Sequence, residues 1–125
     1  TELRATLAAA RQAYPDRRIV VAFQPHLYSR TREHGAAMGQ ALAAADLLVV
    51  TDVYGAREAP QPGITGKLVA DAAVDAGAFV LYEPRRDELA GEIAGMLREG
   101  DVLLTVGAGD VTRVGPDVRA LLEAR

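Results

Sequence analysis

The stretch from Ile19 to Arg32 reads "IVVAFQPHLYSRTR" and is the strongest indication of the fold. Its first five residues are all apolar, with no polar residue alternating among them. A strand of this kind is covered on both faces, as strands of parallel sheets are when helices pack against each side. A histidine, a tyrosine, a serine and two arginines follow almost at once. The stretch therefore predicts a buried parallel strand that ends in a polar loop.

Three more apolar runs along the chain have the same character. They cover residues 47–51, 78–82 and 102–106 and are dominated by valine and leucine. Segments with apolar residues at helical spacing lie before the first run, between successive runs and after the last one. This alternation predicts an α/β fold, a Rossmann-like three-layer domain with a mostly parallel sheet and helices on both faces.

Several residues mark where the helices should begin or end. Thr65 is expected to cap the helix before the third strand, and Gly77 to end it. Asp87 is expected to cap the next helix. The last helix should begin near Pro116, because proline suits the first helical position. Its inward-facing residues would be Val118, Leu121 and Leu122.

Length and composition limit the classes of protein to consider. The chain has 125 residues, which suits one domain over 1–125, and half of them are hydrophobic. A net charge of −3 argues against a nucleic-acid partner, and no apolar run is long enough to cross a membrane. The lack of cysteine favours the cytoplasm. Because the chain opens at Thr1 without methionine, we expect it to be a piece of a longer protein.

Polar residues and glycines gather where the predicted strands end. In a parallel sheet these positions meet at one edge, where ligands bind. The residues there include His26, Tyr28, Ser29, Arg30, Asp52, Tyr54, Gly107, Gly109 and Asp110. Arg30 and the start of a helix expected near Thr31 would suit a carboxylate or a phosphate. The residues equally allow a plainer alternative, in which Ser29 or Thr31 only caps that helix and the arginines are solvated.

Other chemistries fit these residues less well. Ser29 lacks the glycine neighbours of a nucleophile elbow, and His26 and His34 lack the spacing and cysteine support of a metal site. The segment "GITGKL", 63–68, resembles a phosphate loop but follows no strand, so a turn into a capped helix is the better interpretation. The segment "GAGD", 107–110, lacks the third glycine of a dinucleotide fingerprint and predicts instead a close backbone approach at the ligand edge.

Three motifs in this order resemble the C-terminal domain of the Mur ligases. They are "FQPHLYSRT", "TDVYGAREAPQPGITG" and "VGAGDV", at 23–31, 51–66 and 106–111. Thr1 and Glu2 look like the end of the hinge that introduces this domain. The resemblance implies an N-terminal domain for a UDP-sugar and a central domain for ATP and Mg²⁺, both absent from this chain. The motifs are most similar to members that join L-alanine to UDP-N-acetylmuramate. Alternatives are the ligase that recycles murein tripeptide and a free-standing Rossmann-like domain that binds an anionic metabolite.

The resemblance also implies roles for single residues. His26 and Arg30 would bind the carboxylate of L-alanine, while Tyr28 and Ser29 shape their loop. Many family members carry arginine where this chain has Leu27, so one guanidinium is missing. The residues expected to support the site or a domain interface are Asp52, Tyr54, Gly107, Gly109 and Asp110. No catalytic residue and no metal ligand is expected in this chain, which alone should be inactive and bind no cofactor.

Overall fold

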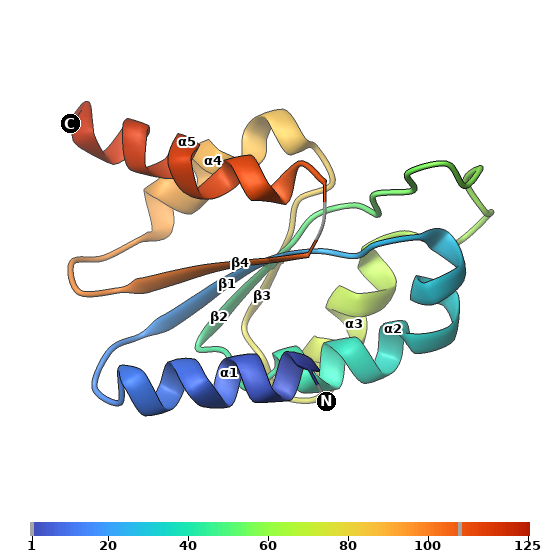
Figure 1. Ribbon diagram of the computed structural model, residues 1–125, viewed down its shortest axis with the longest axis horizontal. Coiled ribbons are helices and arrows are strands. Elements are labelled where there is room, and N and C mark those ends of the chain that lie inside the picture. The colour runs from blue at the N-terminus through green and yellow to red at the C-terminus, as the bar shows by residue number, and fades with distance from the viewer. Residues whose placement is uncertain (1, 108) are drawn as a thin grey trace.

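A computed structural model describes residues 2–107 and 109–125 of the chain. Thr1 of the expected hinge and Ala108 of the "GAGD" segment lie outside the described residues. Four parallel strands form one sheet in the order β3-β2-β1-β4 (Figure 1). The strands are β1 (Ile19–Gln24), β2 (Leu47–Val50), β3 (Val80–Tyr82) and β4 (Val102–Gly107).

Helices cover both faces of this sheet. Figure 1 shows three of them on one face, α1 (Glu2–Ala13), α2 (Tyr28–Leu42) and α3 (Lys67–Asp75). The opposite face carries α4 (Arg86–Met96) and α5 (Val111–Glu123). The predicted three-layer α/β fold is therefore confirmed. No described helix is both long enough and apolar enough to cross a bilayer.

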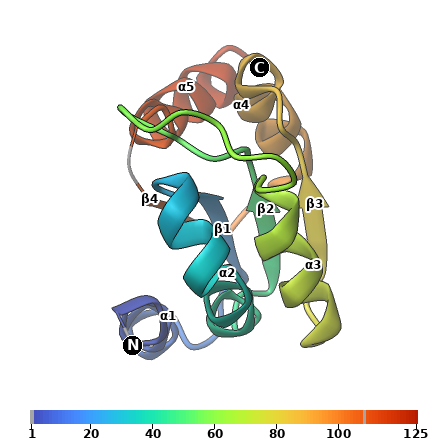
Figure 2. The ribbon, with the colours of Figure 1, turned by 90° about the vertical axis from the view of Figure 1, so that its right-hand side faces the viewer.

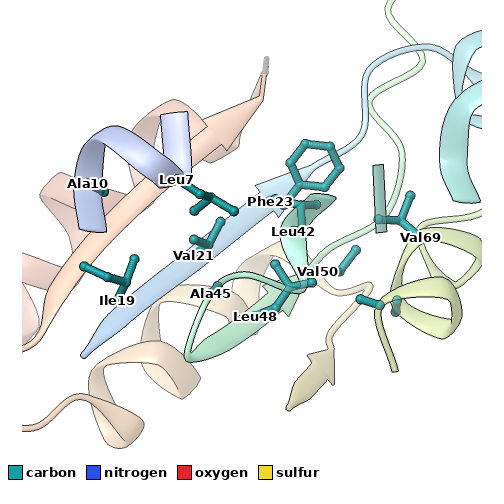
Figure 3. Close-up of a cluster of buried hydrophobic side chains, with 12 residues drawn as sticks. Leu7, Ala10, Ile19, Val21, Phe23, Leu42, Ala45, Leu48, Val50 and Val69 are labelled. Atoms are coloured by element: carbon teal, nitrogen blue, oxygen red, sulfur yellow. The ribbon is translucent and has the colours of Figure 1, made fainter. Parts of the chain in front are cut away.

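The apolar run of β1 is explained by two separate cores. Ile19, Val21 and Phe23 pack with residues of α1, α2 and α3 on one face (Figure 3). Ala22 points the other way and packs with Val49 and residues of α4 and α5. Because successive strand residues face opposite sides, a strand between two helical layers needs apolar residues at every position.

The order of the strands creates a switch point between β1 and β4. The connections through α2 and α3 carry the chain from β1 to β2 and β3, and the connection through α4 returns it to the far side of β1. Neighbouring strands whose connections leave in opposite directions open a crevice at their carboxyl ends, where open α/β sheets bind ligands. The loops after β1 and β4 flank this crevice.

The start of the last helix differs from the prediction. α5 begins at Val111, and Pro116 lies inside it. Val111 and Val114 are almost fully buried, so packing against the sheet favours the earlier start over the preference of proline for a first turn. Val118 is buried as predicted, but Leu121 and Leu122 are 44% and 37% exposed, so their predicted inward position is wrong.

Gly77 ends α3 as predicted, but the cap predicted at Thr65 lies one residue before the observed N-cap, Gly66. The Lys67 N–H donates to the Thr65 hydroxyl at 3.2 Å, and Gly77 has the positive φ of a helix end. The cap predicted at Asp87 is wrong, since α4 begins one residue earlier at Arg86. The carboxylate of Glu83 binds the N–H of Arg85 at 2.8 Å and holds the chain as it enters α4.

Candidate functional site

The loop after β1 and the segment after β2 pair with each other at the carboxyl edge of the sheet. The Leu27 N–H donates to the Tyr54 carbonyl at 2.9 Å, and the Tyr54 N–H donates to the Pro25 carbonyl at 2.8 Å. The rings of His26 and Tyr54 stack, with centroids 6.0 Å apart and planes 17° from parallel. Figure 2 views this edge and shows the segment 52–66, in green, lying between α2 and the layer of α4 and α5. The backbone pairing therefore sets the position of His26.

The loop after β4 reaches the same place through two glycines. A Cβ at Gly109 would lie 2.6 Å from Cγ of Tyr54, and the φ of +85° also favours glycine. A Cβ at Gly107 would overlap the carbonyl of Gln24. The close backbone approach predicted for this segment therefore exists, and its partners are the ring of Tyr54 and the end of β1.

Helix α2 begins at Tyr28, three residues before the predicted start near Thr31. Leu27 precedes it with φ +67° and ψ 134°, a conformation that costs energy in a residue with a side chain. The buried hydroxyl of Thr31 donates to the carbonyl of Leu27 at 2.8 Å. Neither Ser29 nor Thr31 caps the helix in the sense predicted, because Thr31 lies inside it and binds back to the residue that precedes it.

The first turn of α2 already holds an anion of the protein itself. The carboxylate of Glu58 accepts the N–H of Ser29 at 3.0 Å and also the hydroxyl of Ser29. These hydrogen bonds, first that of the hydroxyl and then that of the N–H, lower the pKa of Glu58. The predicted free amides at this helix start are therefore partly occupied. Glu58 had no predicted role, because only the folded chain brings it 29 positions back to Ser29.

His26 and Arg30 remain as the positively chargeable side chains beside this helix start. His26 is half-buried against Tyr54, whereas Arg30 is exposed. Among the described residues, neither side chain makes a hydrogen bond or an ion pair. Tyr28 closes the other side of the loop, since a Cβ at Gly55 would lie 2.5 Å from its ring. A ligand carboxylate that reached this edge would find the guanidinium of Arg30 and the imidazole of His26 without a hydrogen-bond partner among the described residues.

Asp52 ties together the two ends of the segment 52–66. Its carboxylate accepts the N–H of Val53 at 2.8 Å and the N–H of Gly66 at 3.1 Å. Lys67 pairs with Asp71 on the next turn at 2.9 Å. The amide and the lysine that a phosphate would need are thus engaged within the protein, which supports the interpretation of "GITGKL" as a turn into a helix.

Two further contacts were not predicted from the sequence. Gln24 is buried and joins the segment after β2 to the start of α5 through its side-chain amide. Asp110 pairs with Arg86, which links the loop after β4 to the first turn of α4. The feature of the sequence that could have indicated the role of Gln24 is a polar residue at the end of an otherwise apolar strand. Within the described parts of the chain, no group of three histidine or acidic side chains could hold a metal ion.

Comparison with known proteins relates this chain to one family. The family described as Mur ligase, glutamate ligase domain, matches residues 1–109. The UDP-N-acetylmuramate–L-alanine ligase of Streptomyces griseus is 54% identical over 118 residues, which cover 94% of this chain and 25% of that protein. The chain therefore spans about a quarter of the length of this relative.

Solved structures have the same fold. The UDP-N-acetylmuramate-alanine ligase of Thermotoga maritima matches 98% of this chain and 24% of its own, with a TM-score of 0.79 and 28% identity. A murein peptide ligase of Psychrobacter arcticus matches 96% of this chain and 25% of its own, with a TM-score of 0.73 and 15% identity. At that identity the second likeness concerns the fold alone.

Proposed function

This chain belongs to the Mur ligase family, and from that membership we propose that it is the C-terminal domain of a ligase that joins L-alanine to UDP-N-acetylmuramate. The observation that carries the proposal is the 54% identity, along nearly the whole chain, to a relative named for this reaction. The murein tripeptide ligase and a free-standing binding domain have less support, because relatives at about 50% identity are named for the ligation of alanine and are about four times as long as this chain.

We propose that residues 1–125 act as the amino-acid-binding domain of a longer enzyme. An N-terminal domain would hold UDP-N-acetylmuramate, and a central domain would hold ATP and Mg²⁺. ATP would supply an acyl phosphate on the muramoyl carboxylate, which the amine of L-alanine attacks. Because ATP and a nucleotide sugar are cytoplasmic metabolites, we propose a cytoplasmic enzyme without a nucleic-acid or membrane partner.

The segment "GITGKL", 63–68, does not fit a loop for the phosphates of ATP. Gly66 donates its N–H to Asp52, and Lys67 is paired with Asp71. The described residues also lack a cluster of carboxylates that would hold the metal. Phosphate transfer is therefore assigned to the proposed central domain.

The role proposed for this edge is to hold alanine by its carboxylate. Arg30 offers a guanidinium fork suited to a carboxylate, and His26 offers a second group that can donate a hydrogen bond. Tyr28 and Ser29 would shape the loop that presents them. Leu27, at the position of an expected arginine, leaves the cradle with one guanidinium fewer.

The remaining residues of the edge would support this cradle. Asp52 and Tyr54 hold the segment that packs on His26. Gly107, Gly109 and Asp110 bring the loop after β4 against it. In this proposal the chain supplies no catalytic acid or base. Its contribution is the orientation of the amine and the exclusion of water when the domains close.

An assay of the full-length protein tests the function. We expect product with the mass of UDP-N-acetylmuramoyl-L-alanine, together with ADP and phosphate, when alanine, UDP-N-acetylmuramate and ATP are all present. Glycine, serine and murein tripeptide serve as competing substrates. The chain alone should form no product. Preferred ligation of the tripeptide, or ligation by these 125 residues alone, would refute the assignment.

A further inference from the structure

Gln24, the last residue of β1, is the point at which the loops of the candidate site are joined. The residue is only 1% exposed. A buried amide is costly unless both its donor and its acceptor are satisfied, because it gives up its bonds to water. The partners of this amide therefore show why glutamine stands at a position that otherwise favours an apolar residue.

Both ends of the amide bind backbone groups of other loops. Nε2 donates to the carbonyl of Asp52 at 3.2 Å, and Oε1 accepts the N–H of Val111 at 3.0 Å. A backbone carbonyl can only accept and a backbone N–H can only donate, so these partners determine the orientation of the amide. A carboxylate could satisfy only Val111, and an apolar side chain could satisfy neither.

The backbone of Gln24 completes the junction. Its carbonyl lies directly against Gly107, where any larger residue would overlap it. One residue thus contacts the segment that carries Tyr54, the loop that carries Gly109 and the start of α5. His26 follows only two positions later on the same strand end.

We propose that Gln24 is a positioning residue for the ligation of alanine. It holds the His26 loop, the Tyr54 segment and the Gly109 loop in one arrangement without contacting the substrate. This inference rests on the proposed function, because the edge that it organises is the one assigned to alanine. Displacement of a substrate-orienting loop by about 1 Å can lower a rate by roughly a hundredfold, so a residue of this kind has a measurable effect.

The variant Gln24→Glu in the full-length enzyme tests the proposal through pH. The ionised carboxylate faces the Asp52 carbonyl with no proton to donate, whereas the protonated acid can donate there and accept from Val111. Burial favours the protonated form, so protonation should restore the junction as the pH falls. We expect kcat/KM for alanine to be about ten- to a hundredfold below wild type at pH 8 and to approach wild type near pH 6. The KM for ATP should change less than about twofold, because the central domain, and not this junction, is proposed to hold ATP.

The comparison is made as a ratio to wild type at each pH. Gln24 shares a cavity of about 250 Å³ with charged residues that are the same in wild type and variant, so the ratio isolates the effect of the substitution. They are Arg86, Asp87, Asp110, Arg113 and Asp117, and the carboxylate of Asp52 also lies nearby.

The matched control is Gln24→Met, which has neither the donor nor the acceptor. It should lose alanine activity to a similar extent at every pH. The proposal is supported if activity recovers at low pH in Gln24→Glu and not in Gln24→Met. Three outcomes would assign Gln24 a purely structural role and overturn the proposal. They are a loss in Gln24→Glu that is equal at every pH, a rise in the KM for ATP that accompanies the loss, and unfolding of both variants. A wild-type enzyme that does not ligate alanine would instead refute the proposed function.

Discussion

The carboxylate of Glu58 binds the backbone N–H and the hydroxyl of Ser29 in the first turn of α2. The protein thus places its own anion at the helix start that the sequence suggests for a ligand. A substrate carboxylate at this edge must rely on the side chains of Arg30 and His26, unless it displaces Glu58. This contact also joins the segment after β2 to α2.

The Glu58–Ser29 contact should contribute a pH-dependent part of the stability. Because the pKa of Glu58 is lowered in the folded chain, its contribution is present above the unfolded pKa, about 4.3, and is lost as pH falls through the folded pKa. In Glu58→Gln we expect a lower urea midpoint than wild type at pH 7 and a smaller difference near pH 3. Glu99→Gln, at an exposed position, is the control and should follow wild type at both pH values. Equal differences at both pH values would contradict the role of the charge.

Arg30 should matter for alanine and not for ATP. A hydrogen bond to a charged group contributes about 1.5–3 kcal/mol, so Arg30→Ala should lower kcat/KM for alanine by roughly ten- to a hundredfold in the full-length enzyme. The KM for ATP should stay near the wild-type value. Arg32→Ala removes another exposed arginine from the same helix and should change neither parameter. Unchanged KM and kcat for alanine in Arg30→Ala would remove this residue from the site.

Gly39 should be required for the close packing of α2 against α3. A Cβ there would lie 2.5 Å from the carbonyl oxygen of Val69 and 2.7 Å from Cβ of Ala72. Gly39→Ala should therefore lower the free energy of unfolding by about 1–3 kcal/mol, although alanine is the better helix former. Gly91→Ala in α4, where nothing lies within 4 Å, should raise it by about 0.5–1 kcal/mol. Urea unfolding measures the free energy of unfolding of both variants. A Gly39→Ala variant more stable than wild type would show that α2 and α3 separate easily.

The pair of Arg18 and Asp101 should stabilise the amino-terminal edge of the sheet. Nη2 of Arg18 lies 2.6 Å from the carboxylate of Asp101, whose side chain is only 6% exposed. The Arg98 N–H binds the same carboxylate at 2.8 Å. The hydrogen bond from Arg18, the largest cause, lowers the pKa of Asp101. Asp101→Asn should therefore cost about 1.5–3 kcal/mol at pH 7, with a smaller effect in acid.

An exposed ion pair provides the control for Asp101. Asp71 pairs with Lys67 on the surface of α3, and both side chains are mostly exposed. Asp71→Asn should change the free energy of unfolding by less than about 0.5 kcal/mol. Similar urea midpoints for the two variants would show that burial adds nothing to the Arg18 pair.

Much of the candidate edge could be predicted from local sequence. His26, Arg30 and Tyr54 follow apolar runs, and parallel strands bring such positions to one side of the sheet. The start of α5 could not be predicted in this way, since Pro116 indicates a first turn when the segment is considered alone. The burial of Val111 and Val114 outweighs that preference, and it depends on strands far away in the sequence.

The sequence by itself determined the α/β alternation and the family, and it predicts the edge at which a ligand is proposed to bind. These follow from short-range patterns, because a strand covered on both faces must be apolar at every position. Only the tertiary structure decided which polar groups meet there. Glu58 reaches Ser29 across 29 positions, and Gln24 reaches Val111 across 87. Such contacts depend on strand order and register, which bring distant loops within hydrogen-bond distance and leave no periodic trace in the chain.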